Sequence, residues 1–260
     1  MKDLCEFEEL YARLEDIKKR AVRGEVGISA FLSPRESHYA SIYLKQSGAQ
    51  FFLYGGYRDA ERKRMYILPS YMEGISSVKE LAEYDIDSAT VAVRAKGSGF
   101  CRLAHKDFMG SLLGLGIDRS VIGDIITLSD NEALVICDLK ISDFLINEWN
   151  SAGRDRIKCT SADLDENFSV ERKYLQINDT LASERLDCVV AALCNLSREK
   201  ARECVVGGLC ELDYEQEIRP DRSVPDGALI SVRGYGKFKV FEIGGQTKKG
   251  RLRLSAGKFV

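Results

Sequence analysis

The chain has 260 residues, of which 45% are hydrophobic and 30% charged, and its formal net charge at pH 7 is −2. This composition indicates a soluble globular protein rather than a disordered one, and the length suits two or three domains. No stretch approaches the ~20 apolar residues that span a bilayer, and the first 20 residues mix acids with bases, so we expect the protein to stay in the cytoplasm.

The first 75 residues are predicted to form a small α+β domain. Apolar residues spaced three and four apart indicate a helix over residues 6–22, and a second helix is predicted after Pro34. The segment QFFLYGGYRDAERKRMYILP then indicates two strands around a glycine turn, because glycine adopts positive φ at little cost. The basic residues in this segment are either a solvated flank or secondary contacts to RNA or protein: Arg58, Arg62, Lys63 and Arg64.

Residues 76–165 are predicted to form a ferredoxin-like domain. Six segments alternate as strand, helix, strand, strand, helix and strand: TVAVRAK, HKDFMGSLLGLG, VIGDIITL, ALVIC, DLKISDFLINEW and DRIKCTS. RNA-recognition motifs share this order, and they stack bases on aromatic residues of their central strands. The inner strands predicted here contain no aromatic residue, so a structural core is favoured over RNA stacking on this sheet.

The rest of the chain is predicted to contain a linker or edge strand (166–181), a compact domain (182–243) and a basic tail (244–260). The segment SERLDCVVAALCNL places Leu186, Val189, Val190, Leu193 and Leu196 on one helical face, and Ser197 can cap a second helix. A loop with the turn Pro225-Asp226-Gly227 then leads into the strand ALISVRGYGKFKVFEI.

Cations concentrate in this last part of the chain. Residues 231–260 hold eight bases and one acid, whereas the other 230 residues hold 30 bases and 39 acids, so one end of the molecule should meet a polyanion. Arginine binds phosphate bidentately, and glycine allows a close backbone approach. The predicted RNA contacts are Arg185, Ser197, Arg198, Lys200, Arg202, Arg233, Gly234, Gly236, Lys237 and Lys239, with Asp187 orienting the arginines. The tail would add long-range attraction through Lys248, Lys249, Arg251 and Arg253.

The residues RLDCVVAALCNLSREKARECVVGGLCELD and PDGALISVRGYGKFKV resemble the S-four RNA-binding domain, which is appended to many translation factors. The chain departs from that domain at Asp213-Tyr214, where many relatives carry an Asn-Gly turn, and at Ala228. With FLSPRE, FFLYGGYRDAERKR and HKDFMGSLLGLGIDRSVIGDI, the resemblance extends over nearly the whole chain to the bacterial YlmH family. That resemblance implies a factor of ribosome-associated quality control. Its partners would be large-subunit ribosomal RNA, peptidyl-tRNA and other quality-control factors, and it would support alanine tailing of stalled nascent chains.

No catalytic residue, cofactor, metal ion or small-molecule substrate is predicted. The segment KGSGF at 96–100 has Arg102 where a dinucleotide-binding loop has its third glycine. His105 and Asp107 are two residues apart on a helix, so they form no ready acid–base dyad. The eight cysteines form no C-x-x-C pair and mostly adjoin apolar residues, which favours reduced, buried thiols, and two histidines are too few for a histidine-rich metal site.

Two alternatives remain open from the residues alone. An RNA-modifying enzyme with its active site in 76–165 would turn over RNA and lose activity when His105 or Asp107 is changed. A protein-interaction adaptor, for example in cell division, would keep its partner after ribonuclease treatment and ignore Arg198→Glu. The preferred interpretation is a non-enzymatic RNA-binding protein; six phosphate contacts would lower its affinity about a thousandfold between 50 and 200 mM salt.

Overall fold

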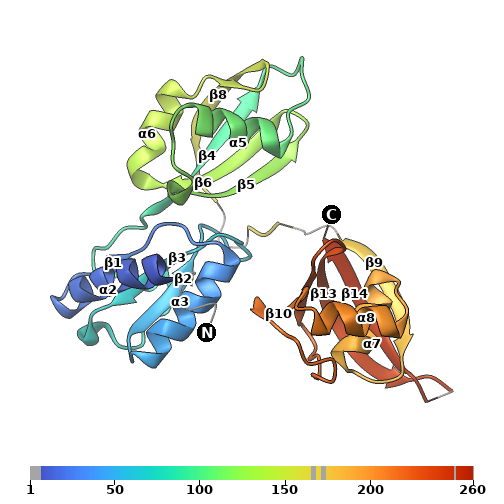
Figure 1. Ribbon diagram of the computed structural model, residues 1–260. Helices are drawn as coiled ribbons and strands as arrows, with labels where there is room; N and C mark the ends of the chain where they lie inside the picture. Colours follow the sequence, from blue (N-terminus) through green and yellow to red (C-terminus); the bar gives the residue numbers. More distant parts are fainter. Residues whose placement is uncertain (1–6, 165–167, 171–173, 249, 260) are drawn as a thin grey trace. The chain divides into compact units, whose positions relative to one another are not determined.

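The computed structural model describes residues 7–164, 168–170, 174–248 and 250–259. It forms two compact units, residues 1–170 and 171–260. Helices and antiparallel sheets occur in both, which confirms the predicted α+β class (Figure 1). Within the described part of the chain, no helix combines the length and the apolar character needed to cross a membrane.

The N-terminal part of the first unit is a three-stranded sheet with helices packed against it. The sequence predicted the two strands of the glycine-turn segment and missed the short first strand. A capping box at Ser33 and Glu36 fixes the start of the second helix. Leu14, Leu44 and Met65 are fully buried between these helices and the sheet. The elements are α2 (Glu8–Val22), β1 (Gly27–Ile28), α3 (Pro34–Gln46), β2 (Gln50–Tyr54), β3 (Arg64–Leu68), the 3-10 helix η1 (Ser70–Met72) and α4 (Val78–Ala82), and the sheet order is β1-β3-β2.

The central part of the first unit has the predicted strand and helix order. Its elements are β4 (Thr90–Gly97), α5 (His105–Gly114), the 3-10 helix η2 (Arg119–Val121), β5 (Ile122–Ser129), β6 (Glu132–Asp138), α6 (Leu139–Glu148), β7 (Ser151–Ala152) and β8 (Asp155–Ala162). The antiparallel sheet order β5-β6-β4-β8-β7 contains the four-strand arrangement of a ferredoxin-like fold. Helices α5 and α6 cover one face of this sheet, where Phe108, Leu112 and Leu145 are fully buried.

The opposite face of the central sheet is partly covered by the N-terminal part of the same unit. Phe31, Tyr57 and Ala60 pack with Leu134 and Ile136 of β6 in one buried cluster. Gly56 adopts a φ of 92°, and a Cβ atom there would lie 2.7 Å from Cγ2 of Ile136, so glycine is required by both the backbone and the packing. This covered area is a structural core, as the sequence favoured, and bases cannot stack on it.

The predicted secondary contacts Arg62 and Arg64 are internal structural residues. The side chain of Arg64 is 7% exposed; it forms an ion pair with Asp138 at 2.9 Å and donates to the carbonyl oxygens of Ser29 and Ala89 at 2.7 and 2.8 Å. Arg62 donates to the carbonyl oxygens of Phe31, Ile122 and Arg119. The prediction that these two arginines contact an outside partner is therefore wrong, because carbonyl and carboxylate groups of the same unit already bind their guanidinium groups.

The second unit has a six-stranded antiparallel sheet in the order β11-β10-β12-β13-β14-β9. Its elements are β9 (Tyr174–Leu181), α7 (Leu186–Cys194), α8 (Arg198–Val206), β10 (Cys210–Leu212), β11 (Glu215–Gln216), β12 (Leu229–Val232), β13 (Gly236–Gln246) and β14 (Leu252–Phe259). Of the two readings of 166–181, the edge strand holds for the residues of β9. The predicted tail contains β14, which pairs with both β13 and β9 and is an inner strand of the sheet.

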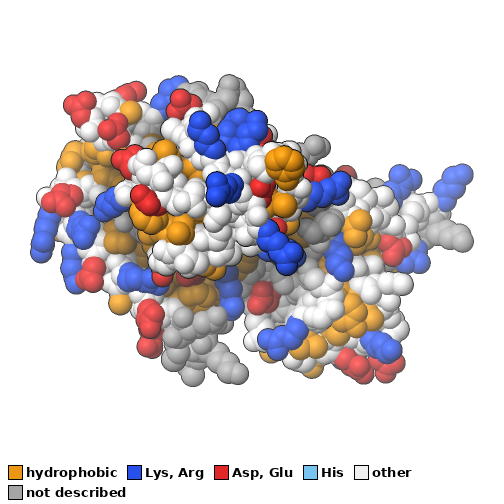
Figure 2. All heavy atoms as spheres, turned by 90° about the horizontal axis from the view of Figure 1, so that it is seen from above, with side chains coloured by type: hydrophobic (Ala, Val, Ile, Leu, Met, Phe, Trp, Pro, Cys, Tyr) orange, Lys and Arg blue, Asp and Glu red, His pale blue; other side chains and the backbone are white. Residues whose placement is uncertain are grey.

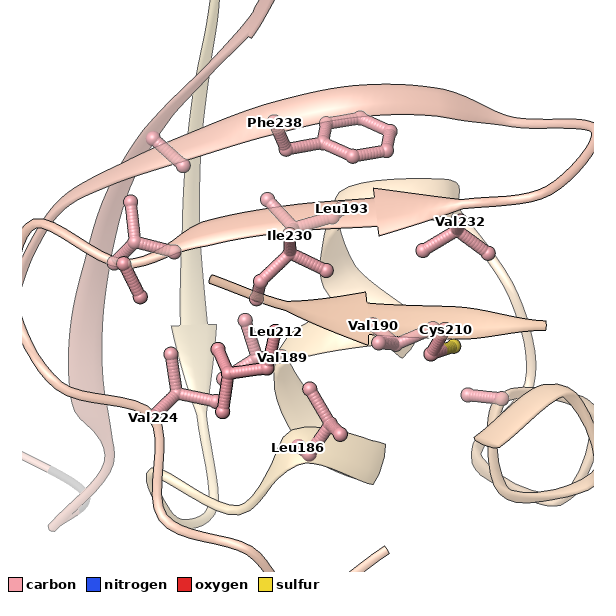
Figure 3. Packing of buried hydrophobic residues seen from close by; sticks show 14 of the residues in the cluster. Leu186, Val189, Val190, Leu193, Cys210, Leu212, Val224, Ile230, Val232 and Phe238 are labelled. Carbon is pink, nitrogen blue, oxygen red and sulfur yellow. The ribbon is translucent and has the colours of Figure 1, made fainter. Parts of the chain in front are cut away.

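Helices α7 and α8 pack on one face of this sheet. Val189, Val190 and Leu193 of α7 meet Ile230, Val232 and Phe238 of the sheet in a buried cluster (Figure 3). The strands therefore bury alternate residues toward the helices and leave the others on the far face. Asp213 and Tyr214 form the turn between β10 and β11 with φ values of 49° and 73°. These are the left-handed conformations of a two-residue hairpin turn, reached here without the Asn-Gly pair.

Candidate nucleic-acid interface

A buried carboxylate holds two arginines at the start of α7 and α8. Asp187 is 2% exposed, and its oxygens accept hydrogen bonds from Nε and Nη2 of Arg185 at 3.1 and 3.0 Å. Nε of Arg198 lies 3.6 Å from the same carboxylate. The two arginine side chains are 40% and 60% exposed, so each presents donors to solvent while Asp187 restrains its orientation. Asp187 thus has the position predicted for it.

Two further cations lie on α8 beside this pair. Lys200 and Arg202 are exposed, while Ala201 and Val205 of the same helix are buried in the core. The Ser197 hydroxyl accepts a hydrogen bond from the backbone N–H of Lys200 and caps α8. We call the four cations on these helices the helix-side cluster: Arg185, Arg198, Lys200 and Arg202.

The stability that Asp187 contributes is expected to depend on pH. Burial raises the pKa of this carboxyl, but the hydrogen bonds from Arg185 and the charges of Arg185 and Arg198 outweigh burial, so the pKa lies below its ordinary value. Because the pKa of Asp187 is lower in the folded than in the unfolded protein, its carboxylate stabilises the fold at pH values above the unfolded-state pKa of about 3.9. This stability is lost as the pH falls through the folded-state pKa. Hydrogen exchange of the α7 amides, corrected for intrinsic rates, should accelerate below about pH 4 in wild type. Asp187→Asn should lack this component, and identical acid profiles for the two proteins would contradict the assignment.

Lys237 and Lys239 lie on the other face of the sheet, not beside the helix-side cluster. Both alternate along β13 with Phe238 and Val240, which are buried against the helices. The ammonium group of Lys237 lies 5.1 Å from the ring centroid of Tyr214 and 5.4 Å from that of Phe259. Nζ of Lys239 donates to the carbonyl oxygen of Gly227. The single contact set predicted from the sequence is therefore two surfaces on opposite sides of one unit.

The turn between β12 and β13 carries the other predicted residues. Arg233 is exposed. Gly234 and Gly236 have φ values of 86° and 120°, so the backbone of the turn alone requires glycine at both positions. A close approach of RNA to these glycines remains a prediction.

The basic residues predicted as a tail flank the far end of the β13–β14 hairpin. Lys248, Arg251 and Arg253 are exposed, and Lys249 lies outside the described residues. Figure 2 shows Lys and Arg side chains gathered at this end of the hairpin, at the right of the view. In the first unit, the remaining predicted secondary contacts, Arg58 and Lys63, line an open pocket beside β2 and α4.

Asp107, one of the two residues considered for catalysis, has a structural role. Asp107 accepts a hydrogen bond from the backbone N–H of Ala104 and so caps α5, which begins at His105. Burial raises the pKa of the Cys137, Cys159 and Cys210 thiols to about 12, so they stay protonated at neutral pH. Cys101 is exposed, contrary to the core position expected of most cysteines. Within the described ranges, no group of three or more potential metal ligands occurs.

Comparisons with known proteins agree with this picture. A family model described as the putative RNA-binding domain in YlmH matches residues 80–166. Ribosome-associated protein quality control protein P2 of Bacillus subtilis (strain 168) is 29% identical over 229 residues, which is 88% of this chain and 85% of that protein. The structure of cell division protein ylmH from Streptococcus pneumoniae is similar in fold, with a TM-score of 0.51 and 17% identity over 63% of this chain and 93% of that one.

The ferredoxin-like central sheet and the sheet of the second unit with its helical pair define an α+β protein, and the matched family model describes an RNA-binding domain. The family model, the B. subtilis relative and the similar fold all point to one family within this class. The chain is thus similar to proteins of the YlmH family over most of its length.

Proposed function

We propose that this protein is a non-enzymatic RNA-binding factor of ribosome-associated quality control. It binds the large ribosomal subunit through phosphates of ribosomal RNA and peptidyl-tRNA, and it supports alanine tailing of the stalled nascent chain. The cytoplasm, where ribosomes work, is its proposed location. The observation that carries the proposal is the orientation of Arg185 and Arg198 by the buried Asp187.

The helix-side cluster suits a folded RNA for physical reasons. Guanidinium groups bind phosphate oxygens bidentately, and two arginines restrained by one carboxylate lose less conformational freedom on binding than free side chains. The name of the B. subtilis relative places that protein in ribosome-associated quality control, and the matched family model describes an RNA-binding domain. Both support the same role for this chain.

Co-sedimentation from cell lysate tests the proposal. Wild-type protein should sediment with large subunits that retain peptidyl-tRNA, whereas Arg198→Glu/Arg202→Glu should stay at the top of the gradient, because the reversed charges repel phosphate. Arg13→Glu/Lys45→Glu changes the net charge equally on exposed residues of α2 and α3, outside the region matched by the RNA-binding family model, and it should sediment like wild type. If both variants sediment like wild type, the role of the helix-side cluster is wrong.

The alternative functions predict other results in the same samples. An adaptor would keep its partner after ribonuclease treatment and in Arg198→Glu/Arg202→Glu. An RNA-modifying enzyme would alter RNA in the bound fraction and lose that activity when His105 is changed.

A further inference from the structure

Aromatic side chains surround Lys237 on the face of the second unit opposite the helices. The ring of Tyr174 meets those of Phe241 and Phe259 edge to face, with centroids 5.2 and 5.0 Å apart. Lys237 lies over the rings of Phe259 and Tyr214. These residues come from strands β9, β13 and β14 and from the turn after β10, and we call them the sheet-side cluster: Tyr174, Tyr214, Lys237, Phe241 and Phe259.

Gly257 of β14 lets two of these rings meet on the sheet surface. It pairs with Lys239 and Gln176 in the neighbouring strands, between Tyr174 and Phe241. A Cβ atom at Gly257 would lie 2.7 Å from Cβ of Tyr174 and 2.9 Å from Cζ of Phe241. The rings therefore lie directly over the backbone of β14, where any larger residue would displace them.

The cluster is accessible although it is aromatic. Phe241 is 37% exposed, and the other four side chains are half-buried. Tyr214, in the left-handed conformation that the β10–β11 hairpin turn requires, holds its ring beside Lys237. A half-exposed group of rings against a cation is costly to leave facing water, so a ligand is expected there.

The charge on this face favours an anionic ligand with flat apolar groups. Lys237 and Lys239 lie on the same face of β13, two residues apart. Two acids share this face. Glu211 of β10 is separated from Lys237 by Ser231 of β12. The exposed Glu242 follows Phe241 and pairs with Ser255. Arg253, opposite Gly244, adds a third cation to the face, so the basic end is the one that holds Lys237 and Lys239. Single-stranded nucleic acid has the complementary chemistry, since its bases stack on aromatic rings while its phosphates pair with lysine.

We propose that the sheet-side cluster binds unpaired nucleotides of RNA, with one base stacked on Phe241 and the adjoining phosphates at Lys237 and Lys239. This inference rests on the proposed function and adds a second RNA surface to it. The helix-side cluster binds folded RNA by its phosphates, and the sheet-side cluster holds a single-stranded segment on the other face of the same unit.

Binding of a fluorescein-labelled decauridylate to the full chain, followed by anisotropy, tests the inference. Phe241→Ala and Phe241→Leu should each weaken binding about tenfold, because both remove the ring, and Phe241→Tyr should bind like wild type. Leu175→Ala is the matched control, since Leu175 is an exposed apolar residue beside Tyr174 in β9. Lys237→Gln should reduce the slope of log affinity against log salt concentration by about 0.7, the contribution of one phosphate contact to a single strand.

Three outcomes would overturn the inference: no binding of the decamer by wild type, equal binding by Phe241→Ala, or full binding by Phe241→Leu. The first of these would favour a protein segment as the occupant of this face. Thermal unfolding midpoints of the Phe241 variants should match wild type, and Phe241→Leu keeps the test valid if Phe241→Ala is unstable. Arg198→Glu/Arg202→Glu should still bind the decamer while losing large subunits, so failure of one surface is separable from failure of the other.

Discussion

The affinity for purified large ribosomal subunits is expected to fall about a hundredfold when salt rises from 50 to 200 mM. The helix-side cluster holds four cations, and each phosphate contact to a duplex adds about 0.9 to the slope of log affinity against log salt. Four contacts give a slope near −3.6. Six contacts, as the sequence alone suggested, would give a slope near −5.4 and a loss of about a thousandfold. The structure favours the smaller value because Lys237 and Lys239 lie on the opposite face.

The salt dependence of a charge-reversal variant tests the same number of phosphate contacts. Arg198→Glu/Arg202→Glu removes two contacts, so its residual binding should show a slope smaller by about two. Arg13→Glu/Lys45→Glu should keep the wild-type slope and lose only long-range attraction. A flat salt response of the wild type would contradict phosphate binding altogether. A slope near −5.4 would mean that cations of the other face also contact the subunit.

Local patterns in the sequence predicted most elements of the fold because helix and strand periodicities are local properties. The order of strands and helices between residues 88 and 162 also fixed the central topology, since few arrangements satisfy a split β-α-β order. The prediction that residues 244–260 form only a basic tail was wrong, because the fold of this segment depends on a long-range strand pairing. Leu252, Leu254 and Ala256 alternate as in a strand, but β14 pairs with β9 between residues 71 to 85 positions apart in the chain, and no local pattern predicts that pairing.

The candidate site was predictable in its residue types and less so in its geometry. The spacing of Arg185, Asp187 and Arg198 around a helical pair predicted their proximity, because residues near one helix junction meet by local geometry. The alternation of Lys237 with the apolar Phe238 along one strand already indicated that Lys237 faces away from the helices. The same alternation marks Phe241 as a neighbour of the lysines, and the sequence interpretation missed it. Tyr174 comes from a distant strand, so its place beside Phe241 required the structure.

The segment around Gly56 shows why the charge of a segment does not predict which of its basic residues are exposed. Arg58 and Arg64 belong to one basic segment, yet Arg58 is exposed and Arg64 is 6% exposed. The segment is fixed by Asp124 of β5, whose carboxylate accepts hydrogen bonds from the Tyr57 hydroxyl at 2.8 Å and the Arg62 N–H at 3.1 Å. A carboxylate more than 60 residues away thus holds the backbone of this basic segment, and no local pattern predicts that contact.

Replacement of Arg64 by methionine is expected to destabilise the first unit by about 3–5 kcal/mol. The change leaves Asp138 as a buried carboxylate without its ion pair at 2.9 Å, and breaking one partner of a buried pair costs this much because the remaining charge stays desolvated. The carbonyl oxygens of Ser29 and Ala89 also lose their donor. Urea unfolding followed by the fluorescence of Trp149, the single tryptophan, reports this unit, since Trp149 is buried in the core of its central sheet.

Two further variants separate the buried charge from other causes. Arg64→Met/Asp138→Leu should recover much of the loss, because an apolar pair replaces the ion pair and no charge is left unpaired; the recovery stays incomplete because Asp138 also caps α6. Arg58→Met, at an exposed position of the same motif, should change stability by less than about 0.5 kcal/mol. If Arg64→Met is as stable as Arg58→Met, Arg64 does not join the two parts of the unit, and its assignment as a structural residue fails.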